Sequence, residues 1–272
     1  MFRVDKLDVS QFGTIVRDEN PSFSGIVAGE CKGEVWVDDL EHPTLALVHS
    51  SSVGGFCILG EPEQQETYTY FNHFLEKELF PWLRARGVDY FEFSVAQTHA
   101  EKAILALFSD KTLDQEYEHT YQKSTVSTEE AAVNYGEYSI HCVDEAFLAR
   151  MNADHFTNSA MIRNRILGAW GSEETFLSKG LAYAAVHRDE IVAVIMGTAF
   201  YNKMLPIDIE TAAEHQRQGL AHQLTLHFAD ACVRRGLLAH WNCMESNTGS
   251  SRTALKAGFT FLHKRYVYWF PI

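Results

Sequence analysis

The feature of this 272-residue chain that most restricts its fold is a strand, a short glycine-containing loop and a long helix in direct succession. Residues 206–211 alternate apolar and polar side chains, which predicts a strand. The helix predicted over 220–235 follows Gly219, carries an apolar stripe and ends before Gly236. A further strand is predicted at 238–241. Strands that alternate with helices in this way predict an α/β fold.

The rest of the C-terminal half completes the same sheet. Residues 181–187 and 191–196 are apolar runs separated by Arg188-Asp189-Glu190, which predicts a β-hairpin with a charged tip. A short helix is predicted at 250–257 and a terminal strand at 266–270. The C-terminal half therefore runs strands, long helix, strand, short helix, strand.

The N-terminal half shows the same order of elements. We predict strands at 33–38, 45–49, 55–60 and 90–94, a long helix at 66–86 with a kink at Pro81, a helix around 103–108 and a strand through 117–121. The polar stretch Ser124–Tyr135 is the predicted boundary between domains at 1–125 and 136–272. Two explanations of this similar order of elements in the two halves stay open. The N-terminal half is either a degenerate repeat of the C-terminal half or an unrelated α/β domain, since the residues hardly match.

Charge and composition exclude several classes of function. The formal net charge is −13, which argues against a nucleic-acid binder that neutralises phosphates. The longest strongly apolar stretch, 191–200, is too short to cross a bilayer, so no membrane association is expected. The five cysteines form no CxxC pair, and we expect a cytoplasmic protein. His215, His222 and His227 lack the spacing of helical metal ligands, and no metal site is predicted. A monomer and a homodimer both remain open.

The loop at 216–221 has the composition of an anion cradle. Gly219 lets the backbone approach a ligand without a Cβ atom. The helix that begins at Leu220 offers free N–H groups and the positive end of its dipole. A strand, tight loop and helix in this order predict a phosphate or pyrophosphate site.

Here the chain resembles the GCN5-related N-acetyltransferases, the GNAT superfamily. Gln216-Arg217-Gln218-Gly219-Leu220-Ala221 fits that family's acetyl-CoA motif of Gln or Arg, two residues, Gly, one residue, then Gly or Ala. Asn247 with Gly258-Phe259 eleven and twelve positions later resembles its second signature. The resemblance implies the GNAT fold for 136–272. Trp241 with Asn247, and the N-terminal pattern at 34–39 and 55–56, are similar to the subfamily typified by the zwittermicin A resistance acetyltransferase.

The resemblance assigns roles to eleven residues. Backbone N–H groups of the loop would bind the pyrophosphate of coenzyme A, backbone groups of the preceding strand would meet pantetheine, and two polar side chains further on would hold the pantetheine arm. In that order the residues are Gln216, Arg217, Gln218, Gly219, Leu220 and Ala221; Ile209, Glu210 and Thr211; Asn247 and Ser250. Six of them have a structural alternative, namely a solvated charge at Arg217, ordinary strand pairing at 209–211, and helix capping by Asn247 or Ser250.

Acetyl transfer to an amine needs a base, because an ammonium group must first lose a proton. Strand alternation places Asp208 and Glu210 on one face. Glu210 is our first candidate for the base, and Asp208 and Glu245 are reserves. Ordinary surface carboxylates are the alternative. Many family members carry a Tyr seven residues after the Asn as the acid for the leaving thiolate, and here that position is Ala254. Replacements considered are water, Ser250, Ser251, Tyr266 and Tyr268.

Two functions therefore remain open at this point. The first is an N-acetyltransferase that moves an acetyl group from acetyl-CoA to a primary amine of a small molecule, with a cationic acceptor favoured by the negative charge. The second is a non-catalytic acyl-CoA-binding or regulatory protein, a reading that Ala254 supports. The N-terminal helix at 65–86 follows no glycine-rich loop, so we predict that it does not bind coenzyme A.

Overall fold

The computed structural model describes residues 1–4, 15, 19–127 and 131–272. Its contacts divide the chain into two units, Met1–Glu118 with Arg265–Ile272, and His119–Lys264. Both divisions fall within strands, namely β6 (Asp114–Lys123) and β13 (Thr260–Pro271). The boundary predicted within 124–135 lies a few residues beyond the first division, and the grouping of the last eight residues with the N-terminal half was not predicted.

The second unit is built on a mixed sheet. Four consecutive antiparallel pairings join β7 to β11, and a parallel pairing joins β11 to β12. The strands are β7 (Asn134–Tyr135), β8 (Tyr138–Cys142), β9 (Ala182–His187), β10 (Glu190–Gly197), β11 (Met204–Thr211) and β12 (Leu238–Met244). The predicted hairpin is β9 and β10, and Arg188 takes a positive φ of 56° at its tip. The predicted α/β fold is thereby confirmed, and its sheet is mixed.

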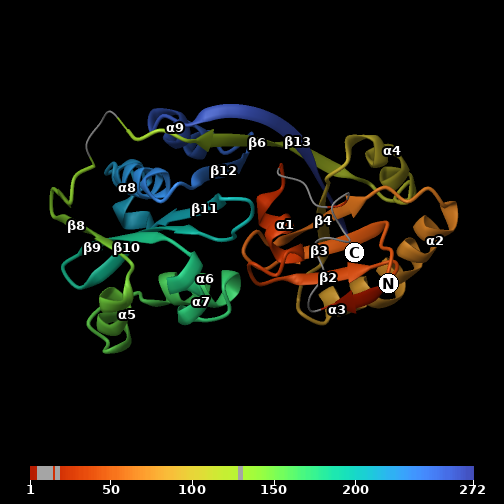
Figure 1. Cartoon of the computed structure of the whole chain (residues 1–272), viewed down its shortest axis with the longest axis horizontal. Helices are drawn as coiled ribbons and strands as arrows, with labels where there is room; N and C mark the ends of the chain where they lie inside the picture. Colours follow the sequence, from red (N-terminus) through yellow and green to blue (C-terminus); the bar gives the residue numbers. More distant parts are fainter. Residues whose placement is uncertain (5–14, 16–18, 128–130) are drawn as a thin grey trace. The chain divides into compact units, whose positions relative to one another are not determined.

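Helices cover both faces of this sheet (Figure 1). They are α5 (Glu145–Asn152), α6 (Ala160–Ala169), α7 (Glu173–Lys179), α8 (Leu220–Arg234) and α9 (Thr248–Lys256). Helix α8 contacts all four strands from β9 to β12, whereas α6 packs on β10. Gly236 and Gly258 follow α8 and α9 with positive φ angles, the conformation that ends a helix at little cost.

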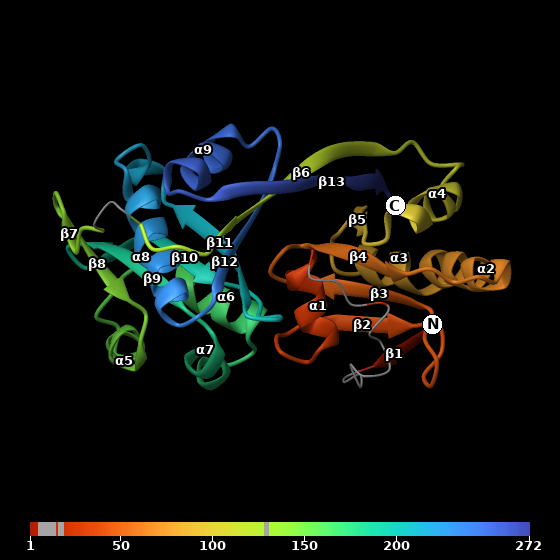
Figure 2. The ribbon, with the colours of Figure 1, turned by 45° about the horizontal axis from the view of Figure 1, so that its top comes forward.

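The first unit has the same order of strands and long helix as the second unit. Strands β1 to β4 pair antiparallel in succession, β4 pairs parallel with β5, and β13 pairs antiparallel with β5. The elements are β1 (Phe2–Val4), α1 (Pro21–Val27), β2 (Glu34–Val37), β3 (Leu45–Ser50), β4 (Gly55–Gly60), β5 (Tyr90–Val95) and α4 (Thr98–Ala106). Figure 2 shows β2, β3 and β4 side by side. In both units a strand, a long helix and a parallel strand follow antiparallel strands.

The long helix of the first unit contains a π-helical turn. It runs as α2 (Gln65–Phe74), η2 (Leu75–Leu79, π) and α3 (Phe80–Arg84) and ends before Gly87. This wider turn precedes Pro81, where the sequence predicted a kink. Proline has no N–H to donate and its ring crowds the carbonyl four residues back, so the preceding turn opens.

Aromatic residues dominate the core beneath that helix. Phe91 is fully buried and its ring lies within 5.0–6.2 Å of five other phenylalanine rings. One of these is Phe270 in β13, so the C-terminal strand contributes to the core of the first unit. This packing explains why residues 265–272 group with the N-terminal half.

Candidate functional site

The carboxyl end of β11 has one edge that β12 does not occupy. The β11–β12 ladder consists of Met204↔Leu238, Leu205↔Ala239 and Pro206↔His240. Residues 207–211 continue to pair with β10 on the opposite edge. The backbone groups of Ile209, Glu210 and Thr211 that face away from β10 are therefore placed to bind an extended ligand, as ladder groups do in a sheet.

The loop after β11 is fixed by its own residues. The Gln216 side chain donates from Nε2 to the carbonyl of Thr211 at 3.1 Å. Arg217 takes a φ of 60° and Gly219 a φ of 84°, both in the left-handed region. The first helical hydrogen bond of α8 runs from Gln223 N to Gly219 O at 3.1 Å.

Donors for an anion gather at the start of α8. The amides of Leu220 and Ala221 precede the first helical hydrogen bond, so the helix provides them with no acceptor. Gln216, Arg217 and Gln218 are exposed beside them. The 15-residue helix adds the positive end of its dipole. Binding of an anion by the loop at 216–221 stays a prediction, and these exposed side chains and amides are the groups that would take part.

The side chain of Tyr135, in β7, packs against Gly219 of this loop. A Cβ atom added to Gly219 would lie 2.7 Å from the Tyr135 hydroxyl oxygen and 3.3 Å from its ring. Neighbouring backbone is anchored to α8 as well, because Ala132 N donates to Gln223 Oε1 at 3.0 Å. Ala132 and Tyr135, two residues of the predicted boundary stretch, therefore contact the candidate site and its helix.

We expect Gly219→Ala to lower the free energy of unfolding by about 1 kcal/mol, because alanine is strained at positive φ and its Cβ meets the Tyr135 hydroxyl. The same substitution in a Tyr135→Phe background removes the closest contact and costs less. Denaturant unfolding of the four proteins measures both costs. If Gly219→Ala lowered the free energy of unfolding equally in both backgrounds, the Tyr135 hydroxyl would not be the group that crowds position 219.

Two carboxylates of β11 share one guanidinium from α6. Arg165 Nε donates to Asp208 Oδ2 at 2.7 Å, and Arg165 Nη2 donates to Glu210 Oε2 at 2.5 Å. Burial opposes the charge of Arg165, but the two carboxylates outweigh it and raise the pKa of the guanidinium. Asp208 and Glu210 lie on one face, as the strand alternation predicted.

The carboxylates of Asp208 and Glu210 are accessible to solvent, whereas the guanidinium of Arg165 is largely buried. The side chain of Glu210 is 51% exposed and that of Arg165 is 18% exposed. A third donor of Arg165, Nη1, binds the carbonyl of Met161 at 2.8 Å. The cluster therefore presents carboxylate oxygens to solvent from a rigid base, an arrangement that can accept a proton or hold an ammonium group.

The second predicted segment is a capped helix. Asn247 Oδ1 accepts a hydrogen bond from Ser250 N at 3.1 Å and caps α9. The Ser250 hydroxyl accepts from Trp241 Nε1 at 2.9 Å. The capping alternative is thus present in the fold, and contacts of these two side chains with a cofactor stay a prediction.

The structure distributes the other candidates as follows. Ala254 is fully buried, so its methyl group supplies no proton donor. Glu245 pairs with His119 at 3.3 Å and with Lys264 at 4.0 Å. Tyr268 belongs to the first unit, where its hydroxyl donates to Glu101 at 2.9 Å; burial first and then this carboxylate raise its pKa.

Sequence reasoning missed two residues of the site. Arg165 lies in a helix that we did not predict and meets its partners 43 and 45 positions later. Tyr135 lies in a two-residue strand within a polar stretch. Neither position carries a local pattern that marks it, because both contacts depend on which strands become neighbours.

None of the helices in the described ranges is long and apolar enough to cross a membrane. Among residues 1–4, 15, 19–127 and 131–272, no three His, Cys, Asp or Glu side chains are grouped so that they could hold a metal ion.

The model of the GNAT acetyltransferase family matches residues 14–268. The uncharacterized N-acetyltransferase YdfB of Bacillus subtilis strain 168 is 28% identical over 100 residues, which are 37% of this chain and 38% of that relative. The match thus spans well under half of the relative's length.

Solved structures share the fold. A GCN5-related N-acetyltransferase-like protein from Streptococcus suis 89/1591 aligns with a TM-score of 0.58 and 17% identity over 88% of both chains. A tandem GNAT protein from the clavulanic acid biosynthesis pathway aligns with a TM-score of 0.57 and 12% identity, covering 97% of this chain and 94% of that one. At such identities the likeness is one of fold.

Proposed function

Because the chain belongs to the GNAT acetyltransferase family, we propose that it transfers an acetyl group from acetyl-CoA to a primary amine of a small molecule by direct attack in a ternary complex. One observation carries this proposal. The anion cradle at 216–221 and the Arg165 carboxylate cluster lie at the same end of β11, so one site can hold both an anionic cofactor and a cationic acceptor.

The backbone of the loop would hold acetyl-CoA. The amides of residues 216–221 would receive its pyrophosphate, with Arg217 and Gln218 beside them, and the open edge at 209–211 would receive the pantetheine arm. Gly219 would bring no side chain of its own between the loop backbone and the cofactor. When bound, acetyl-CoA supplies an acyl group activated as a thioester.

The carboxylates of Glu210 and Asp208 would bind and deprotonate the amine acceptor. Glu210 takes the proton from the acceptor's ammonium group, directly or through a water molecule, so that the neutral nitrogen attacks. Arg165 holds the Glu210 carboxylate on the accessible face, and Asp208 adds negative charge that favours a cationic acceptor. Water is the proposed proton source for the leaving thiolate, since Ala254 offers none.

A second function is favoured by one residue. Ala254 stands where many family members carry the tyrosine acid, and its buried methyl group cannot replace it. A protein that binds acyl-CoA without turnover, as a regulatory module, would tolerate this change.

A turnover assay separates the two functions. Purified protein is incubated with acetyl-CoA and a panel of primary amines, and the released thiol is measured against a blank without amine. We expect amine-dependent thiol release, with dicationic amines better than monocationic ones. Saturable acetyl-CoA binding with no release above the blank for any amine would favour the regulatory function.

We further propose that the chain belongs to the zwittermicin A resistance type within the family and acts in the cytoplasm. The pattern at 34–39 and the Trp241–Asn247 spacing support the first statement. The five cysteines, all free, support the second.

A further inference from the structure

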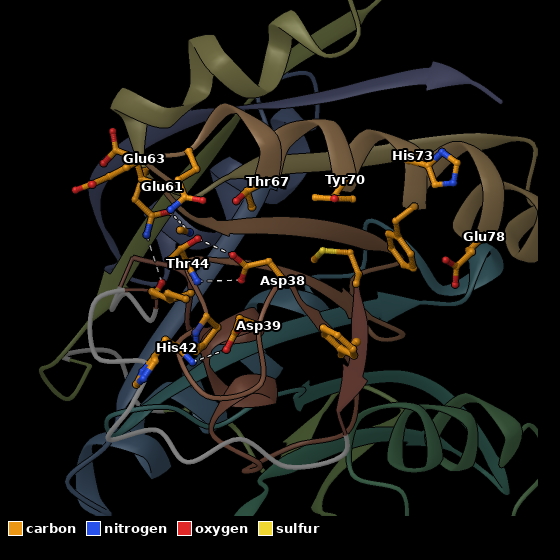
Figure 3. A pocket seen from close by; sticks show the side chains of 18 of the residues that line it. Asp38, Asp39, His42, Thr44, Glu61, Glu63, Thr67, Tyr70, His73 and Glu78 are labelled. Carbon is orange, nitrogen blue, oxygen red and sulfur yellow. Dashed lines mark hydrogen bonds between the residues drawn. The ribbon is translucent and has the colours of Figure 1, made fainter.

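An open cleft of about 880 Å³ lies in the first unit, at the carboxyl end of β4. Its walls come from the β2–β3 turn, the β4–α2 turn and one face of the helix from α2 to η2. Figure 3 shows Thr67, Tyr70 and His73 along the helix, with Asp38 and Thr44 on the facing turn. The volume lies within the range of small-molecule sites.

The described lining carries negative charge without a matching cation. It contains five carboxylates, those of Asp38, Asp39, Glu61, Glu63 and Glu78, and neither lysine nor arginine. Glu61 forms an ion pair with His99, which also lines the cleft. Glu63 and Glu78 are exposed and form no ion pair with a described residue.

Two of these carboxylates are held in place by backbone. Asp38 Oδ1 accepts from Thr44 N and Leu45 N at 2.9 Å, and its Oδ2 accepts from the Thr44 hydroxyl at 2.6 Å. Asp39 Oδ1 accepts from Glu41 N and His42 N at 2.8 Å. These N–H groups lower the pKa of Asp39, His42 first. The turn thus presents fixed negative charge to the cleft.

The cleft lacks the features that are proposed to bind the pyrophosphate of coenzyme A in the second unit. The turn from β4 into α2 carries Glu61 and Glu63 and no glycine loop, so a pyrophosphate would meet like charge. The buried Gln97 side chain accepts a hydrogen bond from Gly60 N at 2.8 Å. The last backbone N–H of β4 is therefore already hydrogen-bonded within the protein.

The carboxylates also do not fit a single metal ion. They are spread over two turns and a helix, and no group of three ligands comes together in the part of the chain that the structure describes. Spread charges match an extended ligand with several positive centres. Between them, the exposed Tyr70 ring and the buried Phe74 ring offer apolar contact for a methylene chain and a face for an ammonium group.

We propose that this cleft binds an aliphatic polyamine, a flexible chain with several ammonium groups, as a ligand site separate from the acetyl-transfer site. Its ammonium groups pair with the carboxylates of the two turns and of η2, and its methylene segments lie against Tyr70 and Phe74. The site belongs to the first unit alone, and the proposal does not depend on acetyl transfer by the second.

Titration calorimetry with spermidine, on the full chain without acetyl-CoA, tests the proposal. The test variant is Glu63→Gln with Glu78→Gln. The control variant, Glu145→Gln with Glu174→Gln, makes the same change of charge on exposed helix positions of the second unit. A third variant, Asp208→Asn with Glu210→Gln, removes the other acidic cluster.

We expect saturable binding to the wild-type chain, at least a fivefold rise in Kd for the test variant, and Kd values within twofold of wild type for the other two. Raising the salt concentration should weaken binding. Absence of saturable binding would overturn the proposal. So would equal weakening in test and control variants, which shows non-specific attraction, or loss only in the third variant, which places spermidine on β11.

Discussion

Replacing Glu210 by glutamine is expected to lower kcat for amine acetylation by about 100-fold or more, the usual contribution of a general base. Glutamine keeps the shape of the side chain, and its amide oxygen can still accept from Arg165 Nη2. It cannot take a proton from an ammonium group.

Steady-state kinetics on the best amine of the panel measure this loss. Glu214→Gln is the matched control, because Glu214 is an exposed carboxylate four residues further along the same segment and is outside the cluster. The control should retain kcat, and acetyl-CoA affinity should stay within twofold in both variants. A wild-type kcat in Glu210→Gln would contradict its assignment as the base and identify it as an ordinary surface carboxylate.

The sequence predicted best the features that depend on neighbouring residues. The strand at 206–211, the loop around Gly219 and helix α8 were all found, because their period, glycine and helix-end signals lie within thirty residues. The hairpin of β9 and β10 was found for the same reason. The placement of Asp208 and Glu210 on one face followed from strand geometry alone.

Features that depend on distant residues were not predicted. Helices α5, α6 and α7 are seven to ten residues long, so each contains too few turns for a helical period to stand out in the sequence. Arg165 was lost with them, although it is the partner of both candidate carboxylates. Strand β13 joins the first unit through its pairing with β5, in a register from Tyr268↔Phe93 to Pro271↔Tyr90 that no local sequence pattern marks.

The acidic cleft of the first unit also escaped sequence reasoning. Asp38 and Asp39 precede β3, while Glu61 and Glu63 follow β4. They meet because β3 and β4 pair antiparallel, which brings both turns to one end of the sheet. Separately, each pair of acidic residues is indistinguishable from an ordinary solvated turn.

The central claim is that acetyl-CoA binds at the loop before α8, and calorimetric titration of acetyl-CoA into the wild-type chain and Gln218→Glu tests it most directly. Gln218 is exposed in the loop, so glutamate fits there without repacking. A carboxylate near a helix start favours the helix, so reduced binding would not reflect unfolding. Gln115→Glu, an exposed position on β6 in the first unit, is the control for added charge.

Like charge next to a bound pyrophosphate should cost about 1.4–2.8 kcal/mol, a 10- to 100-fold rise in Kd. We therefore expect saturable binding to the wild-type chain and to Gln115→Glu, and binding at least tenfold weaker to Gln218→Glu. Wild-type affinity in Gln218→Glu, or no binding to the wild-type chain, would contradict a cofactor site at residues 216–221.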